Sequence, residues 1–160
     1  MERNDAMITE ADHKKQAGGV RTGERPDLPG GGQWIIDMKR GLPGFEGVRR
    51  YSLASKGGET PFCLLSGIDK GPTFIVINPF LVCPDYSPVL PEREARFLGI
   101  DDPSRAILFV IVTIRRDPLD VTVNLRAPVV INADLNTAAQ VVLEDSELPL
   151  RHSIMPKKGK

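Results

Sequence analysis

The run Ala-Ile-Leu-Phe-Val-Ile-Val-Thr-Ile at residues 106–114 is the longest apolar stretch of the chain. It is far shorter than the roughly 20 residues that a membrane-spanning helix needs. β-Branched residues dominate the run, and turn residues bound it on both sides, which is typical of a buried strand. The run therefore predicts a buried strand.

Shorter apolar runs lie on both sides of this strand, separated by Pro, Gly, Asp and Asn. Their spacing predicts an all-β fold, a small antiparallel barrel-like or sandwich domain over residues 33–152 with one short helix. We expect strands at 34–38, 48–53, 62–65, 73–77, 106–114, 121–125, 129–131 and 140–143. The helix is expected at 91–99, where Pro opens the segment, acids precede arginines and Gly closes it. Its buried face should hold Leu90, Phe97 and Leu98.

Three junctions between these strands have recognisable turn chemistry. Arg116-Asp117-Pro118 predicts a turn, because Pro fixes φ at a turn corner and Asp accepts hydrogen bonds from the following backbone. The polar stretch 132–138 predicts a second hairpin loop. Ala127-Pro128 interrupts what would otherwise be one long strand, which implies a bulge, an edge or a change of sheet.

The net charge of zero, from 21 basic and 21 acidic residues among 160, is a sum of unequal parts. Residues 1–50 sum to +1, residues 51–150 to −5 and residues 151–160 to +4. An acidic body offers little to phosphate, so direct nucleic-acid binding is not expected. Residues 1–32 predict a flexible or weakly docked arm, and residues 153–160 a basic tail. The absence of a signal peptide pattern favours a cytoplasmic protein with no membrane association.

The sequence lacks the residues that the common catalytic and metal sites need. No glycine-rich phosphate loop and no Gly-x-Ser-x-Gly elbow is present. Cys63 and Cys83 are too few for a structural zinc site and are expected as half-buried thiols. Asp101-Asp102 stands beside Pro103 and Ser104, which favours turn chemistry over a metal site. We therefore expect no enzyme, no metal and no cofactor, and a binding module by elimination.

Six residues are expected to shape loops. In Gly41-Leu42-Pro43-Gly44 the glycines can supply positive φ and the proline a fixed corner. Phe45 after this turn is expected as a core plug. Asn78-Pro79 ends a buried strand, where Asn can satisfy backbone groups that leave the ladder. The loop-shaping set is Gly41, Pro43, Gly44, Asn78, Pro79 and Pro128.

Three segments, taken in their order along the chain, resemble the flagellar assembly factor FliW family. They are residues 41–46, residues 77–86, and residues 122–132 with their continuation through 140–143 and 149–152. The resemblance covers about residues 34–152. It implies a small cytoplasmic β-barrel-like protein without catalysis. Family members bind newly made flagellin and the translational repressor CsrA in competition, so accumulating flagellin releases CsrA and lowers flagellin synthesis. The N-terminal strand pattern of the family is degenerate here, and Leu65 and Leu148 depart from its usual residues.

Six residues are candidates for partner binding: Phe80, Asp85, Tyr86, Asn124, Arg126 and Asn132. The two aromatic rings, with Leu81, lie on a proline-rich loop and suit either an interface or packing beneath the helix. Asp85 adds to an anionic rim that suits a cationic regulator. Strand alternation places Val121, Val123 and Leu125 on one face and Thr122, Asn124 and Arg126 on a polar one.

The two asparagines can equally contact a partner or close hairpin ends. Partner binding by strand addition beside Pro128 is another route. Three alternatives remain open for the whole chain. One is a small β-barrel that binds RNA through Lys157, Lys158 and Lys160. Another is a chaperone of flagellin alone. The last is an enzyme whose site gathers Asp101, Asp102 and His152.

Overall fold

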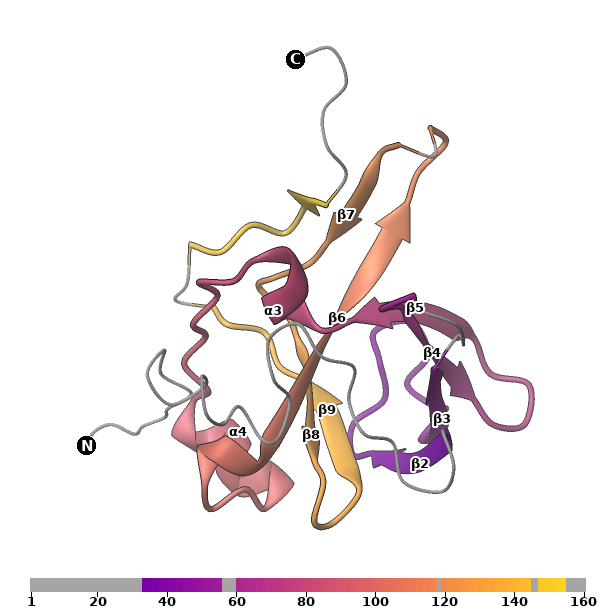
Figure 1. Ribbon diagram of the computed structural model, residues 1–160. Helices are drawn as coiled ribbons and strands as arrows, with labels where there is room; N and C mark the ends of the chain where they lie inside the picture. The colour runs from indigo at the N-terminus through magenta and orange to yellow at the C-terminus, as the bar shows by residue number, and fades with distance from the viewer. Residues whose placement is uncertain (1–32, 56–59, 118, 145–146, 155–160) are drawn as a thin grey trace.

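The computed structural model describes residues 33–55, 60–117, 119–144 and 147–154 (Figure 1). The strands are β2 (Gln33–Met38), β3 (Arg50–Ser55), β4 (Cys63–Gly67), β5 (Thr73–Ile77), β6 (Ala106–Ile114), β7 (Val121–Val123), β8 (Val129–Asn132), β9 (Thr137–Gln140) and β10 (His152–Ser153). The helices are α3 (Pro79–Val82) and α4 (Glu92–Leu98), followed by a 3₁₀ turn at Pro103–Arg105. Within these residues no helix is long and apolar enough to cross a membrane.

Seven of the described strands close into a barrel in the order β6-β5-β4-β3-β2-β9-β8, with β8 returning to β6. The predicted all-β class is confirmed. Strands β2 to β5 form an antiparallel meander, and β6, which follows α3 and α4 in the chain, pairs antiparallel with β5. One pair in this ring is parallel: Asp37 of β2 faces Thr137 of β9 and Met38 faces Ala138. The predicted antiparallel barrel thus contains one parallel pair that the sequence pattern did not indicate.

β6 is the strand around which the molecule is built. Its first half pairs with β8, with Phe109 opposite Val129, and its second half pairs with β7, with Val112 opposite Val123. Two residues of β6 therefore face the five residues 124–128, and the chain bulges at the predicted Pro128 break. In Figure 1 the hairpin of β6 and β7 projects beyond the barrel. β10, which the sequence did not predict, pairs with the outer edge of β7.

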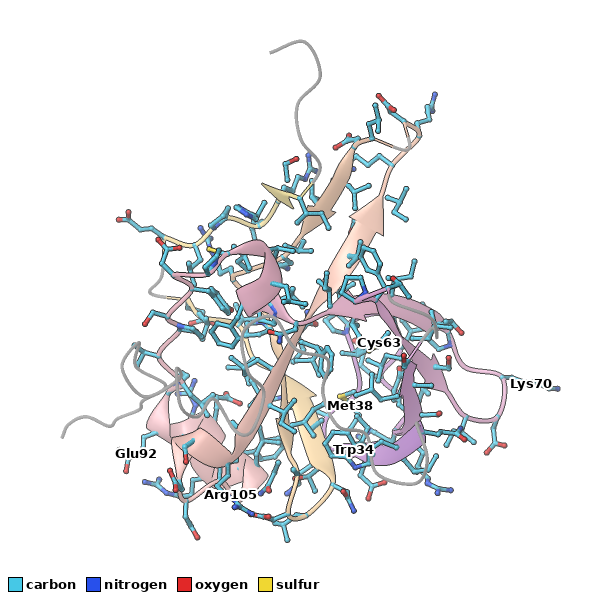
Figure 2. The ribbon with its side chains drawn as sticks, in the orientation of Figure 1. Trp34, Met38, Cys63, Lys70, Glu92 and Arg105 are labelled. Carbon is cyan, nitrogen blue, oxygen red and sulfur yellow. The ribbon has the colours of Figure 1, made fainter. Side chains whose placement is uncertain are left out.

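Both faces of β6 are buried, and each face belongs to a different core. Ile107 and Phe109 enter the barrel, which is filled by residues such as Trp34, Met38 and Cys63 (Figure 2). Ala106, Leu108, Val110 and Val112 face the second core, between the barrel wall, α3 and α4. A nearly continuous apolar run is the composition that such two-sided burial requires.

The two helices cover the second core. α4 ends where predicted, because Gly99 takes the left-handed conformation at φ 75° and donates to the Arg96 carbonyl. Leu98 is buried, but Phe97 lies 37% exposed beneath Lys39 and Arg40, so it does not share the apolar face expected for it. The described residues hold two helices rather than the one expected, since residues 79–82 form α3.

Two further expectations are corrected by the side chains. Phe45 is 41% exposed and packs edge-on against Phe74, so it is no core plug. Cys63 is buried, while Cys83 is the half-buried thiol that was expected. The arm at 1–32 and most of the tail at 153–160 lie outside the described residues.

Candidate protein-interaction surface

The aromatic residues of the proline-rich loop lie in the core. Phe80 and Tyr86 are fully buried, with ring centroids 5.7 Å apart. The Tyr86 hydroxyl donates to the Leu125 carbonyl at 2.7 Å, and burial raises the pKa of this phenol well above its usual range. The hypothesis that these rings contact a partner is replaced by packing beneath the helix, the alternative considered for them.

Asn132 closes a hairpin and ties it to α4. Its Oδ1 accepts from the amides of Asp134 at 2.9 Å and Leu135 at 3.3 Å. Its Nδ2 donates to the carbonyls of Leu98 at 2.9 Å and Gly99 at 3.0 Å. With all four bonds made inside the chain, a 2% exposed side chain has nothing left to offer a partner.

The polar face of the strand after Val121 is covered rather than open. Thr122 is buried next to β10, which pairs with it through Ser153. The Asn124 Oδ1 accepts from the Arg126 amide at 3.0 Å, and the Arg126 Nε donates to the Leu148 carbonyl at 2.9 Å. Both side chains are half-buried. The residues 147–153 therefore take the position that a partner would need.

The loop-shaping residues act locally. Pro43 and Gly44 form a tight turn, closed by the Phe45 amide donating to Leu42 at 2.8 Å, and Gly44 has φ 88°. Gly41 serves close approach instead, because a Cβ there would lie 2.5 Å from the Glu46 backbone. The Asn78 Oδ1 accepts from the Phe80 amide and caps α3, which begins at Pro79. Pro128 accepts from the Val141 amide at 2.9 Å.

The described residues show no cluster of three or more His, Cys, Asp or Glu side chains that could hold a metal ion. Asp102 accepts from the Ser104 amide and hydroxyl, which confirms its turn chemistry. His152 lies against the Val82 carbonyl at 3.3 Å. The gathering of Asp101, Asp102 and His152 that an unrecognised enzyme would need is not seen.

An apolar groove that sequence reasoning missed lies between residues 87–93 on one side and residues 142–144 with Leu148 on the other. It has a volume of about 610 Å³. Val89 on one side is 62% exposed and Val142 on the other is 53% exposed. Its lining consists of Ser87, Pro88, Val89, Pro91, Arg93, Val142, Leu143, Glu144 and Leu148. We call this feature the valine groove.

Both walls of the valine groove follow from local chemistry. Prolines at 84, 88 and 91 keep the first wall out of any ladder, since proline has no N–H to donate. The second wall continues the β8-β9 register, because the amides of Val141 and Leu143 donate to Pro128 and Arg126. The strand predicted at 140–143 is therefore found three residues earlier, as β9 at Thr137–Gln140, and its regular pairing ends at Gln140.

The groove segments hold the acidic surplus of the chain. Residues 83–94 and 142–148 contain six acidic residues and one basic residue, whereas the remaining residues between 51 and 150 contain seven of each. Within the described part of the chain, Asp85, Glu144 and Glu147 have no ion pair, and Arg93 lies 3.8 Å from Glu94. Asp85 accepts weakly from the Cys83 thiol at 3.5 Å. A count of charge by segment was the signal that could have found this surface.

Known proteins resemble the chain over this whole domain. The family model described as FliW protein matches residues 28–154. The flagellar assembly factor FliW of Syntrophus aciditrophicus (strain SB) is 46% identical over 125 residues, which cover 78% of this chain and 79% of that protein. The FliW of Ruminiclostridium cellulolyticum is 36% identical over 128 residues, 79% of this chain and 86% of the relative. A crystal structure of the flagellar assembly factor FliW superposes with a TM-score of 0.71 at 31% identity, covering 78% of this chain and 87% of the other. The chain therefore belongs to the FliW family of flagellar assembly factors.

Proposed function

We propose that this chain acts in the cytoplasm by binding alone, and that a CsrA-type translational regulator and newly made flagellin compete for it. Membership of the FliW family is the observation that carries the proposal. By binding the regulator, the chain relieves repression of flagellin mRNA. By binding flagellin, it returns the regulator to that mRNA.

The surface charge supports a cationic partner. An RNA-binding regulator exposes Arg and Lys, and the acidic groove segments present an opposite field. Such complementarity raises the association rate and selects the partner more than it sets affinity. The regulator should therefore bind quickly at low salt and more slowly as salt screens the field.

Competition makes the switch quantitative. A competitor at about 100 times its dissociation constant leaves roughly 1% of the factor free, and it weakens the apparent affinity for the other partner by about 100-fold. The response to flagellin thus depends on its concentration relative to that constant. Export of flagellin frees the factor again.

Calorimetric titration with purified CsrA and flagellin from the same source tests this function. We expect saturable binding of each partner, and displacement of CsrA when flagellin is added. Binding of flagellin alone would replace the proposal with a chaperone role. Binding of neither would refute both.

The RNA-binding alternative has its own test. Filter binding of flagellin mRNA leader by this chain, with and without residues 153–160, should show no specific complex. A complex that persists without the tail and weakens steeply with salt would favour the alternative.

A further inference from the structure

The valine groove has the size and lining of a docking site. Its volume of about 610 Å³ falls within the roughly 300–1,000 Å³ typical of ligand sites. Val89 and Val142 expose more than half of their surface on opposite walls, and the half-buried Leu148 also lines the groove. Apolar side chains held at this exposure provide favourable contact area for the apolar residues of a partner.

One wall also offers free main-chain groups. Val141 and Leu143 donate their amides toward Pro128 and Arg126 at 2.9 Å and 2.8 Å. In an antiparallel ladder the residue between them directs its N–H and C=O to the opposite edge. No described residue bonds the Val142 main chain there. An extended segment can pair with such an edge by strand addition.

The charge of the groove segments identifies the chemistry of that segment. Among the described residues of 83–94 and 142–148, five are acidic and one is basic, and Glu144 lines the groove itself. The one basic residue of these two segments, Arg93, lies 3.8 Å from Glu94. Glu92 and Glu94 pair with Arg96 and Arg40, so the described acids of these segments without an ion pair are Asp85, Glu144 and Glu147. An acidic segment would be repelled here, whereas a basic one is attracted.

We propose that the valine groove binds an extended, apolar and basic segment of the CsrA-type regulator, whose main chain pairs with Val142. The apolar residues of that segment lie on Val89, Val142 and Leu148, and its basic residues face Glu144 and Glu147. The identity of the partner rests on the function proposed above. The groove, its free edge and its charge are independent of it.

Titration of the full chain with purified CsrA tests the apolar contact. The double variant Val89→Ser/Val142→Ser should weaken CsrA binding about tenfold or more, the scale of lost central interface contacts. Ile114→Ser is the matched control, because Ile114 is 53% exposed like Val142 but lies at the end of β6 on the projecting hairpin. Both variants should keep the thermal midpoint of the unaltered chain.

Association kinetics test the charge. Glu144→Lys should slow CsrA association several-fold at low salt, and the difference should shrink at high salt. Asp101→Lys, the same reversal outside the groove segments, should have a smaller effect. Equal slowing by both would show that only the overall charge matters, and would overturn the assignment of the groove.

The remaining outcomes separate the groove from the proposed function. If the unaltered chain binds CsrA and both groove variants bind it equally well, the groove assignment fails and the proposed function stands. If the variants lose flagellin instead, the groove belongs to that partner and the proposal is wrong. If sedimentation shows a dimer of this chain that Val142→Ser dissociates, the occupant is a second copy. If the unaltered chain binds no CsrA, the proposed function fails with the assignment.

Discussion

Replacing Asn132 by alanine removes the side chain that joins the β8-β9 hairpin to the end of α4. The substitution deletes two acceptor bonds from loop amides and two donor bonds to the Leu98 and Gly99 carbonyls. Because the asparagine is 2% exposed, water does not replace it without a change in packing. We expect a loss of stability and no direct loss of partner binding.

The size of the loss follows from the surroundings of each bond. A neutral hydrogen bond contributes about 1 kcal/mol net, so four bonds set an upper value of about 4 kcal/mol. Asp134 and Leu135 lie on an exposed loop, where their amides can turn to water. The Thr137 hydroxyl still donates to the Leu98 carbonyl at 3.2 Å. The Gly99 carbonyl loses its bond to Asn132. We therefore expect the free energy of unfolding to fall by about 2 kcal/mol, which lowers the thermal midpoint by roughly 6 °C.

Urea unfolding followed by circular dichroism measures this change, and calorimetry with CsrA and flagellin measures binding below the transition. Asn124→Ala is the control, because that side chain is half-buried and accepts one bond, from the Arg126 amide. It should cost less than half as much. An Asn132→Ala chain of unchanged stability that has lost a partner would refute the structural role and restore the partner-contact hypothesis.

Substitutions at two buried tyrosines and two glycines test other parts of the core and one turn. Tyr86→Phe should lower the free energy of unfolding by about 1 kcal/mol in urea titrations, because a buried hydrogen bond is lost. Tyr51→Phe should leave it unchanged or raise it, since that buried hydroxyl has no partner among the described residues. Burial raises the pKa of both phenols in the folded chain, so the unfolded chain ionises first and stability falls as pH rises above about 10. Tyr86→Phe should flatten that fall in melts at increasing pH. Gly41→Ala should cost about 2–3 kcal/mol through a clash with the Glu46 backbone, whereas Gly44→Ala should cost about 1 kcal/mol through its positive φ alone.

Strands with strong local patterns were predictable from the sequence. Thr73–Ile77 and Ala106–Ile114 match their predicted bounds, because each is an apolar run ended by turn residues. α3 was missed although its signal was present: Asn before Pro is a helix start, here for a helix of only four residues. β10 has two residues and no periodicity, so its pairing with β7 depends on tertiary context.

Pro128 explains why the last predicted strand was misplaced. A regular ladder needs both partners of a hydrogen-bonded pair to donate, and Pro128 accepts from Val141 without returning a bond. The β8-β9 register continues to Leu143, but the regular strand ends at Gln140. The apolar pattern at 140–143 thus correctly indicated residues that pair with the preceding strand. The missing N–H of Pro128 determined where the regular strand ends.

The acidic surplus of the chain is visible in the sequence only as a net charge, and the fold determines where on the surface it lies. Between residues 51 and 150 the net charge is −5, and the two groove segments account for all of it. They are separated by nearly fifty residues, so no local pattern predicts that they meet. The barrel brings them together because the chain that follows β9, residues 141–144, lies across the groove from the loop that leads into α4. The polar residues on the strand that begins at Val121, which are among the predicted partner contacts, are covered by residues 147–153. The surface left open is therefore the one with exposed valines and unpaired carboxylates.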